Sequence, residues 1–376
     1  MKKTGIVIIS FAFLLSCKGK EQIVTIENPS DYDRLTDLVE IPLKNLNQIV
    51  LNLGDTYRVV NAAGEVIPSQ LTFDSKLIFQ PGLKANESAT FTIGTGKPQP
   101  FPSKTFGRYV PERKDDFAWE NDRVAFRIYG QALIATDGPS NGLDAWYKRT
   151  SELVIDKWYE NDLTGIASYH SDNGEGLDDY KVGRTLGAGA MAPYLNDTLW
   201  LNENYISQKT LENGPLRTTF QLSYKNLTVG EQTYSETRTF SIDAGSQLTK
   251  VTQEYGGVEK PMSVAAGFVK RSGKDSIFVS PKNNYLVYVE PFSETVDQLY
   301  MGIVFPQGFE KETVNTYAYN EKALHVLTVT TYLPDTPLTY YTGFGWSKFG
   351  FASASEFQNY LSHFVTSLKN PFIVTY

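Results

Sequence analysis

Residues 169–183, "YHSDNGEGLDDYKVG", gather side chains that can exchange protons. The segment holds His170, one of three histidines in the chain, with four carboxylates, two tyrosines and a lysine. An imidazole titrates near neutral pH, and the cations Lys181 and Arg184 near Tyr180 would favour its phenolate form. The pattern predicts an acid–base site; the alternative is a solvated connection between strands, since Asp, Asn and Gly are common loop residues.

Other chemistries fit this segment poorly. An EF-hand needs carboxylates at alternate positions and a closing Glu, which residues 172–175 do not supply. A weaker calcium site through Asp172, Asp178 or Asp179 stays open. His170 is the only nearby imidazole, which disfavours zinc, and no nucleophile elbow surrounds a serine. The glycines of "GRTLGAGAM" precede no Lys-Ser/Thr pair, so nucleotide binding is rejected. We therefore expect no metal and no cofactor.

The segment "WENDRVAFRIYG", residues 119–130, reads as a strand. Alternation sends the apolar side chains of Val124, Phe126 and Ile128 to one face, which would enter the core. The opposite face carries Asn121, Arg123, Arg127 and Tyr129. Two arginines on that face favour an anion-binding surface, because the guanidinium fork suits a carboxylate or a sulfate. The alternative is a half-exposed strand with incidental charges.

The N-terminus has the order of a bacterial lipoprotein leader. Lys2 and Lys3 precede an apolar stretch over residues 5–15, too short to span a bilayer as a stable helix. It ends in "LLSC", in which Cys17, the only cysteine of the chain, would carry the lipid after cleavage. An ordinary signal peptide is the alternative. We expect a lipid-anchored protein of the cell envelope, held to the inner or outer membrane and most simply at the periplasmic face of the outer one.

Charge excludes a nucleic-acid partner. The whole chain has a net charge of −7, and loss of the two leader lysines would leave 33 basic against 42 acidic residues, or −9. Nucleic-acid binding would need a basic surface.

Composition and spacing predict an all-β fold. Aromatic residues make up 13% of the chain, and such residues with Thr and Val favour sheets. Residues 25–98 are expected to form a small N-terminal β-sandwich module without a catalytic role, followed by a linker over residues 96–117. Residues 105–376 are expected to form a large antiparallel β-sandwich, a supersandwich of mutarotase-like type, as the catalytic domain. Its strands are predicted at residues 124–129, 216–224, 234–242, 248–255, 263–269, 285–289, 325–332 and 338–344.

A single helix is predicted near the C-terminus, over residues 353–368. Its apolar stripe is Phe357, Tyr360, Leu361, Phe364 and Leu368, and Ser353 with Glu356 fits a capping box. His363 lies off the stripe and is expected at the surface, and His325 is expected to be structural. Four tryptophans, each considered by itself, are more simply interpreted as core residues than as surfaces on which a sugar ring stacks: Trp146, Trp158, Trp200 and Trp346.

Six segments taken in order resemble one family. They are "WENDRVAFRIYG", "IDKWY", "YHSDNGEGLDDYKVG", "GAGAM", "NGPLRTTFQLSY" and "LTYYTGFGWS". Together they look like a family of lipoproteins and secreted proteins from polysaccharide-degrading bacteria, long catalogued as a domain of unknown function. The resemblance runs from the "NPSDYDR" of residues 28–34 to the C-terminal helix. One branch of that family is similar to ulvan oligosaccharide dehydratases, which remove water from a terminal uronic acid and leave a 4,5-unsaturated sugar.

This resemblance implies an elimination on an acidic oligosaccharide substrate. The hydrogen at C5 must be abstracted, the carboxylate neutralised and the departing hydroxyl protonated. Tyr180 or Lys181 would be the base and His170 the acid, or His and Tyr the reverse. Neutralisation would come from Arg123 and Arg127 or from Arg184. Further substrate contacts are expected from Asn121 and Arg217 and from the aromatic residues Trp119, Trp200, Tyr341 and Trp346.

Several rivals stay open. A polysaccharide lyase would perform the same proton abstraction but expel a sugar. A glycoside hydrolase would use two carboxylates, for which Glu175 with Asp172 or Glu236 are candidates. A non-catalytic carbohydrate-binding lipoprotein would keep an aromatic face and could lose His170 and Tyr180. The fold would also suit a mutarotase-like epimerase.

Overall fold

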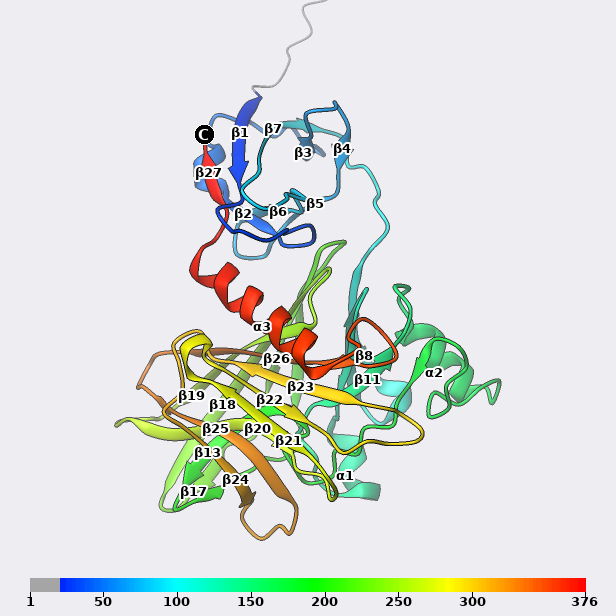
Figure 1. Cartoon of the computed structure of the whole chain (residues 1–376), viewed down its shortest axis with the longest axis vertical. Coiled ribbons are helices and arrows are strands. Elements are labelled where there is room, and N and C mark those ends of the chain that lie inside the picture. Colours follow the sequence, from blue (N-terminus) through cyan, green and yellow to red (C-terminus); the bar gives the residue numbers. More distant parts are fainter. Residues whose placement is uncertain (1–20) are drawn as a thin grey trace, which may run out of the picture.

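The computed structural model describes residues 21–376, so the predicted leader and Cys17 lie outside the described residues. Strands dominate, and the all-β expectation with a helix near the C-terminus is confirmed. In Figure 1 a small module lies above a large sandwich, with α3 (Ala354–Lys369) between them on one side. No helix in this part of the chain is long and apolar enough to cross a bilayer.

The small module consists of two short sheets around their own core. One sheet has the order β27-β1-β7-β3-β4 and the other β2-β6-β5. Their strands are β1 (Gln22–Glu27), β2 (Val39–Pro42), β3 (Thr56–Val60), β4 (Val66–Ile67), β5 (Ser69–Leu71), β6 (Lys76–Phe79), β7 (Ser88–Gly96) and β27 (Ile373–Thr375). β27 differs from expectation: the last residues leave the sandwich and pair with β1, Thr25 opposite Thr375. The chain therefore connects the module to the sandwich twice, between β7 and β8 (Thr105–Val110) and between α3 and β27.

The large sandwich is built on one broad antiparallel sheet. Its order is β15-β16-β18-β19-β26-β23-β22-β21, with β17 paired to β18. The strands are β15 (Ser207–Asn213), β16 (Arg217–Ser223), β17 (Leu227–Val229), β18 (Gln232–Asp243), β19 (Leu248–Gly256), β21 (Ser276–Ser280), β22 (Tyr285–Val289), β23 (Leu299–Val304) and β26 (Leu338–Trp346). Alternate residues of β18 are buried, as the period of two predicts for a sheet with one face on the core.

Two five-stranded sheets cover the inner face of this broad sheet. One has the order β14-β13-β20-β25-β24 and the other β12-β11-β10-β9-β8. Their strands are β8 (Thr105–Val110), β9 (Asp116–Asn121), β10 (Ala125–Ile128), β11 (Asp144–Lys148), β12 (Gly176–Leu177), β13 (Ala188–Leu195), β14 (Thr198–Leu199), β20 (Met262–Val269), β24 (Lys311–Tyr317) and β25 (Leu324–Tyr332). Buried residues from all three sheets form one continuous core. The predicted linker is shorter than expected, because residues 105–110 already form β8.

α3 covers the outer face of the broad sheet. Phe357, Leu361 and Val365 are buried against β22 and β23. The Ser353 side chain accepts a hydrogen bond from the Glu356 backbone N–H, as the capping prediction requires. Of the predicted stripe, Leu368 is exposed. The exposed ring of His363 stacks on Tyr32 of the small module, with centroids 4.0 Å apart.

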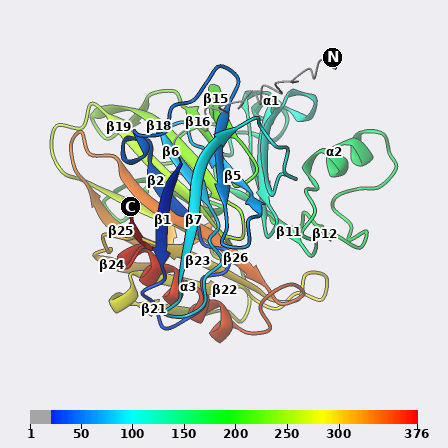
Figure 2. The ribbon, with the colours of Figure 1, turned by 90° about the horizontal axis from the view of Figure 1, so that it is seen from above.

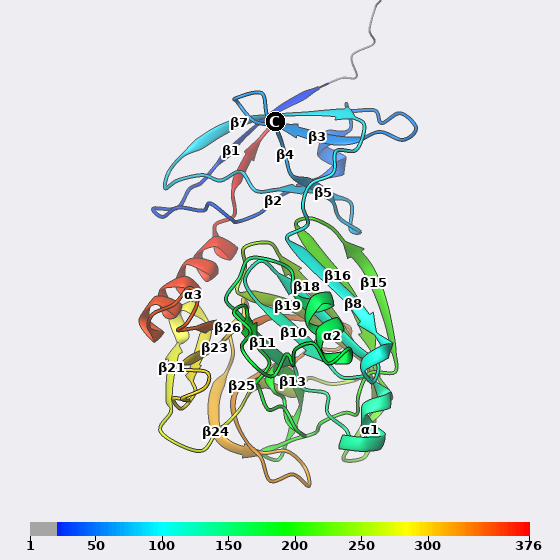
Figure 3. The same ribbon diagram turned by 90° about the vertical axis from the view of Figure 1, so that its right-hand side faces the viewer.

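Two helices were not expected from the sequence. α1 (Gln131–Asp137) follows β10, and α2 (Ile155–Leu163) follows β11. α2 and α3 lie on different sides of the molecule in the views of Figures 1, 2 and 3. α2 covers the polar face of the sheet that contains β9, β10 and β11, so this face is not exposed to solvent.

Candidate functional site

The sheet β8–β12 carries a polar face that is buried. Asp116 and Glu120 of β9, Arg127 of β10, and Asp144 and Lys148 of β11 share this face by strand alternation. The opposite face, with Phe117, Phe126, Ile128 and Tyr147 among its members, enters the main core. The sequence correctly separated Arg127 from the apolar residues of its strand, but it expected a half-exposed polar face, whereas these five side chains are at most 2% exposed. Asn121, which the sequence placed on the same face as Arg127, lies on the opposite face from Asp116 and Glu120 by strand alternation.

α2 and the segment that follows it cover this face. The aromatic rings of Trp158, Tyr159 and Tyr169 pack on Trp146, with centroids 5.1–5.4 Å away. The Glu120 carboxylate accepts hydrogen bonds from the backbone N–H groups that begin α2, at 2.8–2.9 Å. The same carboxylate is 2.6 Å from the Lys148 ammonium. A buried ion pair thus holds the covering helix on the sheet.

Arg127 is the centre of a buried charge cluster. Its Nη2 lies 2.6 Å from Asp144 Oδ2 and 2.7 Å from Asp178 Oδ2, and its Nη1 lies 3.8 Å from Asp116 Oδ2. The guanidinium also lies 5.0–5.5 Å from the ring centroids of three aromatic residues, Tyr129, Trp146 and Tyr169. Because three carboxylates already surround it, Arg127 has no free charge for a substrate. Its predicted role as a substrate-binding residue is therefore wrong.

The cluster holds more carboxylates than it can keep ionised. Burial and the neighbouring Asp144 charge together raise the pKa of Asp178 to about 7, although Arg127 opposes the rise. Burial likewise raises the pKa of Asp116 to about 6, although Arg127 and Arg113 oppose the rise. Oδ1 of Asp116 and Oδ1 of Asp144 have no hydrogen-bond partner in the described structure. A shared proton in this cluster near neutral pH follows from that imbalance.

His170 is the exposed end of this cluster. Its side chain is 51% exposed, and its Nδ1 lies 2.8 Å from the Asp178 backbone oxygen and 3.6 Å from Asp178 Oδ2. A carbonyl oxygen only accepts, so Nδ1 carries the hydrogen, and in the neutral ring Nε2 carries the lone pair. The ring also packs on Tyr169, with centroids 4.5 Å apart. The result is an oriented imidazole that solvent or a ligand can reach.

The remaining carboxylates of the loop have structural partners. Asp172 accepts hydrogen bonds from the N–H groups of Gly174 and Gly176 and pairs with Arg149 at 3.1 Å. Glu175 pairs with Lys157 of α2 at 2.8 Å. Gly176 has a positive φ, and a Cβ there would lie 1.8 Å from the Tyr147 oxygen. The segment of residues 169–183 is therefore an ordered loop that contacts β11 and α2.

Tyr180 cannot serve as the predicted phenolate base. Its side chain is 3% exposed, and its hydroxyl donates to the Gly187 backbone oxygen at 2.9 Å. Burial raises its pKa well above the usual value, and Glu290 adds to the rise although Arg271 opposes it. The Arg271 guanidinium lies 4.6 Å from the Tyr180 ring centroid. Lys181 next to it is 74% exposed and lies 3.3 Å from Asp179, so it stays available.

Arg184 and Trp200 belong to another part of the surface. Arg184 donates to the backbone oxygens of Leu201 and Asn202, and lies 3.8 Å from Glu321. Trp200 stacks on Tyr319 with centroids 4.3 Å apart. No hydrogen bond or ion pair within residues 21–376 joins Arg184 to His170 or Arg127. The expectation that Arg184 acts together with His170 therefore lacks structural support.

Three predicted substrate contacts are core residues. Trp119 is fully buried among aromatic rings and donates from Nε1 to Thr249. Asn121 is fully buried and accepts from the N–H groups of the turn that ends β9. Trp346 is 2% exposed and donates from Nε1 to the Val296 backbone oxygen at 2.6 Å. None has a face for a sugar, because each packs or bonds inside the protein. Arg123 is half-buried on the adjoining turn.

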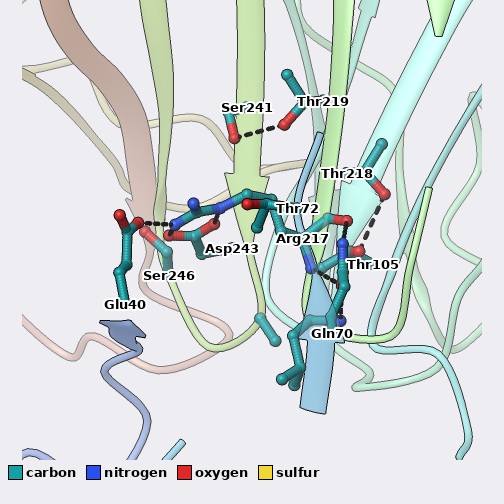
Figure 4. A network of polar contacts seen from close by, with 12 residues as sticks. Glu40, Gln70, Thr72, Thr105, Arg217, Thr218, Thr219, Ser241, Asp243 and Ser246 are labelled. Atoms are coloured by element: carbon teal, nitrogen blue, oxygen red, sulfur yellow. Dashed lines mark hydrogen bonds and ion pairs between the residues drawn. The ribbon is translucent and has the colours of Figure 1, made fainter. Parts of the chain in front are cut away.

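Arg217 and Tyr341 lie together beside a groove between the small module and the sandwich. Arg217 is clamped by Asp243, at 2.5 and 2.8 Å, and by Glu40 of the small module at 2.7 Å (Figure 4). Tyr341 packs edge-on against Phe364 of α3. These two residues are brought together by the structure, but on the α3 side of the molecule rather than at α2.

Sequence reasoning missed the residues that support His170. Asp144, Asp116 and Arg113 were not considered, and Asp178 was weighed only as a calcium ligand. A signal was present in "LDAWYK", where Asp144 begins an apolar strand whose five residues are all buried. An ionisable residue in such a run requires a buried partner. No group of three or more His, Cys, Asp and Glu side chains in the described part of the chain is arranged to hold a metal ion.

Comparison with known proteins gives a family and a fold. The family described as Domain of unknown function (DUF4861) matches residues 26–374. A relative from Formosa agariphila, named Uncharacterized protein P7, is 28% identical over 393 residues, covering 98% of this chain and 97% of the relative.

Two solved structures from Enterococcus faecalis share the fold. One is a protein in the Glycosyl Hydrolase Family 38, with 9% identity and a TM-score of 0.54, and the other is an alpha-mannosidase, with 10% identity and a TM-score of 0.52. Each match covers 94% of this chain. The chain spans about half the length of these proteins, 47% and 46% respectively.

Proposed function

This chain belongs to the family described as Domain of unknown function (DUF4861), and from that premise and the geometry around His170 we propose that it is a carbohydrate-active enzyme. The proposed reaction eliminates water from the terminal uronic acid of an acidic oligosaccharide, of ulvan type, and leaves a 4,5-unsaturated sugar. The observation that carries the proposal is the half-exposed imidazole of His170, oriented by the Asp178 backbone oxygen and backed by the buried carboxylates around Arg127.

His170 is the proposed base. Its neutral Nε2 takes the C5 hydrogen as a proton, the C4–O bond breaks and the C4–C5 double bond forms. The ring is held in place by the Asp178 backbone oxygen, 2.8 Å from Nδ1, with Asp178 Oδ2 3.6 Å from the same nitrogen. The imidazolium then gives this proton to the departing hydroxyl, which leaves as water, and His170 returns to its neutral form. Each such proton transfer contributes on the order of 10²–10⁴-fold to rate.

The substrate carboxylate needs a cation that is exposed and not surrounded by buried carboxylates. Lys181 fits this role better than Arg127, because its ammonium is 74% exposed and its charge lowers the pKa of Asp178, which places it within electrostatic reach of the His170 partner. Neutralising the carboxylate lets negative charge build on it as the C5 proton leaves.

Carbohydrate as the substrate class is supported by two likenesses. Six sequence segments resemble proteins of polysaccharide-degrading bacteria, and the fold resembles that of an alpha-mannosidase and a family 38 glycosyl hydrolase protein. Hydrolysis is less favoured by the geometry. Asp172 and Glu175 are engaged in ion pairs with Arg149 and Lys157, and Glu236 is buried against Arg238 at 2.6 Å.

Mass spectrometry of uronate-terminated oligosaccharides tests the reaction. We expect the wild-type protein to produce a species lighter by about 18 daltons, one water, with unchanged chain length and new ultraviolet absorbance. His170→Gln should abolish this product. Shorter chains with new absorbance would instead identify a lyase, shorter chains without absorbance a hydrolase, and unchanged masses over a broad panel a binding protein.

We also propose that the enzyme is lipid-anchored in the cell envelope through Cys17, at the periplasmic face of the outer membrane. The support is the order of basic, apolar and "LLSC" segments in the leader. Cys17→Ala should move the protein from the membrane fraction to the soluble fraction of the envelope; retention of this variant in the membrane would contradict the anchor.

A further inference from the structure

A groove of about 550 Å³ lies between the small module and the sandwich. Its walls are the segment from Tyr32 to Glu40, the turn between β18 and β19, Tyr341 of β26, and the last turns of α3. The volume is within the roughly 300–1,000 Å³ range of small-molecule sites. α2 and the loop that carries His170 contribute no residue to it.

Hydrogen bonds and one ion pair connect the small module to the sandwich around the groove. Gln70 of the small module receives the N–H groups of Leu216 and Arg217 on its Oε1, at 2.9 Å. Glu40 reaches Arg217 from the same module, as Figure 4 shows. At the α3 end, Tyr32 donates to the His363 backbone oxygen at 2.8 Å. These contacts and two covalent connections join the small module to the sandwich on both sides of the groove.

One side of the groove is aromatic. Tyr341, Tyr360 and Phe364 form a connected set, with Phe364 5.0 Å from Tyr341 and 6.2 Å from Tyr360 between ring centroids. Tyr32 and His363 stack almost parallel, at an interplanar angle of 4°. Aromatic rings combine an apolar face with a polar tip. Such faces suit the C–H surfaces of pyranose rings.

The charges of the groove argue against an anionic occupant. The lining holds four carboxylates and three Lys or Arg side chains. Both arginines are already paired: Arg34 with Asp37 at 2.7 Å, and Arg217 with Asp243 and Glu40. The carboxylates of Glu40 and Asp243 are each 35% exposed. Each of their oxygens already accepts from Arg217 or Lys76, and the remaining lone pairs of these oxygens can accept hydrogen bonds from hydroxyl groups. A uronate or a sulfate, which carries no hydroxyl hydrogen on its charged group, would meet only acceptors at these two carboxylates.

We propose that this groove is a second carbohydrate-binding site, separate from the His170 cluster, and that it takes neutral pyranose residues of a glycan. The aromatic side receives the ring faces, and Glu40 and Asp243 accept the hydroxyl hydrogens. This site does not depend on the elimination chemistry assigned to His170. It would hold the neutral part of a mixed glycan while the acidic end reacts elsewhere.

Calorimetric titration of the full-length chain in detergent tests the site with defined probes. The neutral probes are cellotetraose, mannotetraose and xylotetraose, and the acidic probe of equal length is tetragalacturonate. Tyr341→Ala removes part of the aromatic side, and Leu35→Trp fills the groove from an exposed position on its wall. Tyr317→Ala and Leu333→Trp are matched controls, since both residues are about half exposed and lie outside the groove.

We expect at least one neutral tetrasaccharide to bind, and both groove variants to weaken its binding about tenfold while the controls change it less than twofold. Circular dichroism identifies any variant that fails to fold, and Leu35→Trp then carries the test because its side chain is exposed. The site would be refuted if no neutral probe binds, if groove variants and controls behave alike, or if tetragalacturonate is the probe whose binding the groove variants remove.

Each of the two proposals can be contradicted by an experiment that leaves the other unaffected. His170→Gln should leave neutral-probe affinity unchanged while it removes the dehydration product. If the wild-type chain yields no dehydrated product but the groove variants still weaken the binding of neutral probes, the elimination proposal is contradicted and the groove proposal is supported. If dehydration occurs and no neutral probe binds, the groove proposal is contradicted and the elimination proposal is supported.

Discussion

Arg127 and Asp144 are directly opposite residues of the antiparallel strands β10 and β11, and their Nη2 and Oδ2 atoms lie 2.6 Å apart in a fully buried pair. Two further carboxylates, Asp116 and Asp178, share the same guanidinium. The pair therefore anchors the cluster that positions His170, and it makes Arg127 a structural cation rather than a surface for anions.

Removing this cation should be strongly destabilising. Arg127→Met leaves three buried carboxylates without their main counter-ion, and loss of one partner from a buried pair costs about 3–5 kcal/mol. The loss should be smaller at pH 5 than at pH 8, because protonated carboxyl groups need no counter-ion. Urea unfolding at both pH values measures it.

Arg108→Met is the matched control for Arg127→Met. Arg108 also binds two carboxylates, Glu112 and Asp156, but the three side chains are 28–66% exposed. Exposed pairs contribute about 0–1 kcal/mol. Equal losses in the two variants would contradict the assignment of Arg127 as the centre of a buried cluster.

Asp178 should make stability fall as pH rises. Its folded pKa of about 7 is above the usual value of 3.8, so the folded state keeps a proton that the unfolded state has lost. The stabilisation is complete below about pH 4 and is lost as pH rises through about 7, on the order of a few kcal/mol. Asp178→Asn should flatten this slope in melting curves between pH 4 and 8. An unchanged slope would argue against the raised pKa.

His325 should act in the opposite direction. It is fully buried, accepts a hydrogen bond from the Leu186 N–H on Nε2, and burial lowers its pKa to about 4. The unfolded state then binds a proton between about pH 4 and 6.5 that the folded state rejects, so stability is lost as pH falls across this window, by roughly 3 kcal/mol. His325→Gln should remove this acid sensitivity, and His363→Gln, at an exposed histidine, should leave it intact.

His170→Ala should separate activity from stability. The ring is half exposed, so its removal should change the free energy of unfolding by less than about 1 kcal/mol. Activity on uronate oligosaccharides should fall by about 10²–10⁴-fold, the range for loss of a general base or acid. His363→Ala is the control and should keep most of the activity on short substrates. Full activity in His170→Ala would remove His170 from the mechanism.

The C-terminal strand should stabilise the small module. Phe372 is buried in the core of that module, and Arg34 lies 3.9 Å from its ring centroid. Deleting residues 371–376 removes this side chain and the pairing of β27 with β1. Amide hydrogen exchange should accelerate in β1 and leave β18 and β19 protected. Equal exchange in β1 with and without the deletion would show that β27 is dispensable.

Much of the sandwich was predictable because its strands follow local rules. All eight predicted strand segments are strands in the structure, with ends that differ by one or two residues at most positions. Residues 285–289 match β22 at both ends. α3 was predictable for the same reason, since its stripe and its Ser353 cap lie within one short window of sequence.

The candidate site was only partly predictable. The alternation of "WENDRVAFRIYG" correctly separates Phe126 from Arg127, but it cannot tell water from protein on the polar side. α2 was missed, and it covers that side. Tyr180 failed as a base because its hydroxyl bonds to the Gly187 backbone oxygen, a contact that nothing in the neighbouring cations indicates.

The sequence by itself determined the β architecture, the terminal helix and the polar loop that contains His170, because period, capping and composition act between residues close in the chain. The tertiary structure alone decided which charges are free. Arg127 meets Asp144 across a sheet and Asp178 across a loop, and Arg217 meets Glu40 across two parts of the chain. Whether a charge is paired depends on neighbours distant in sequence, and only folding brings those neighbours within a few ångströms.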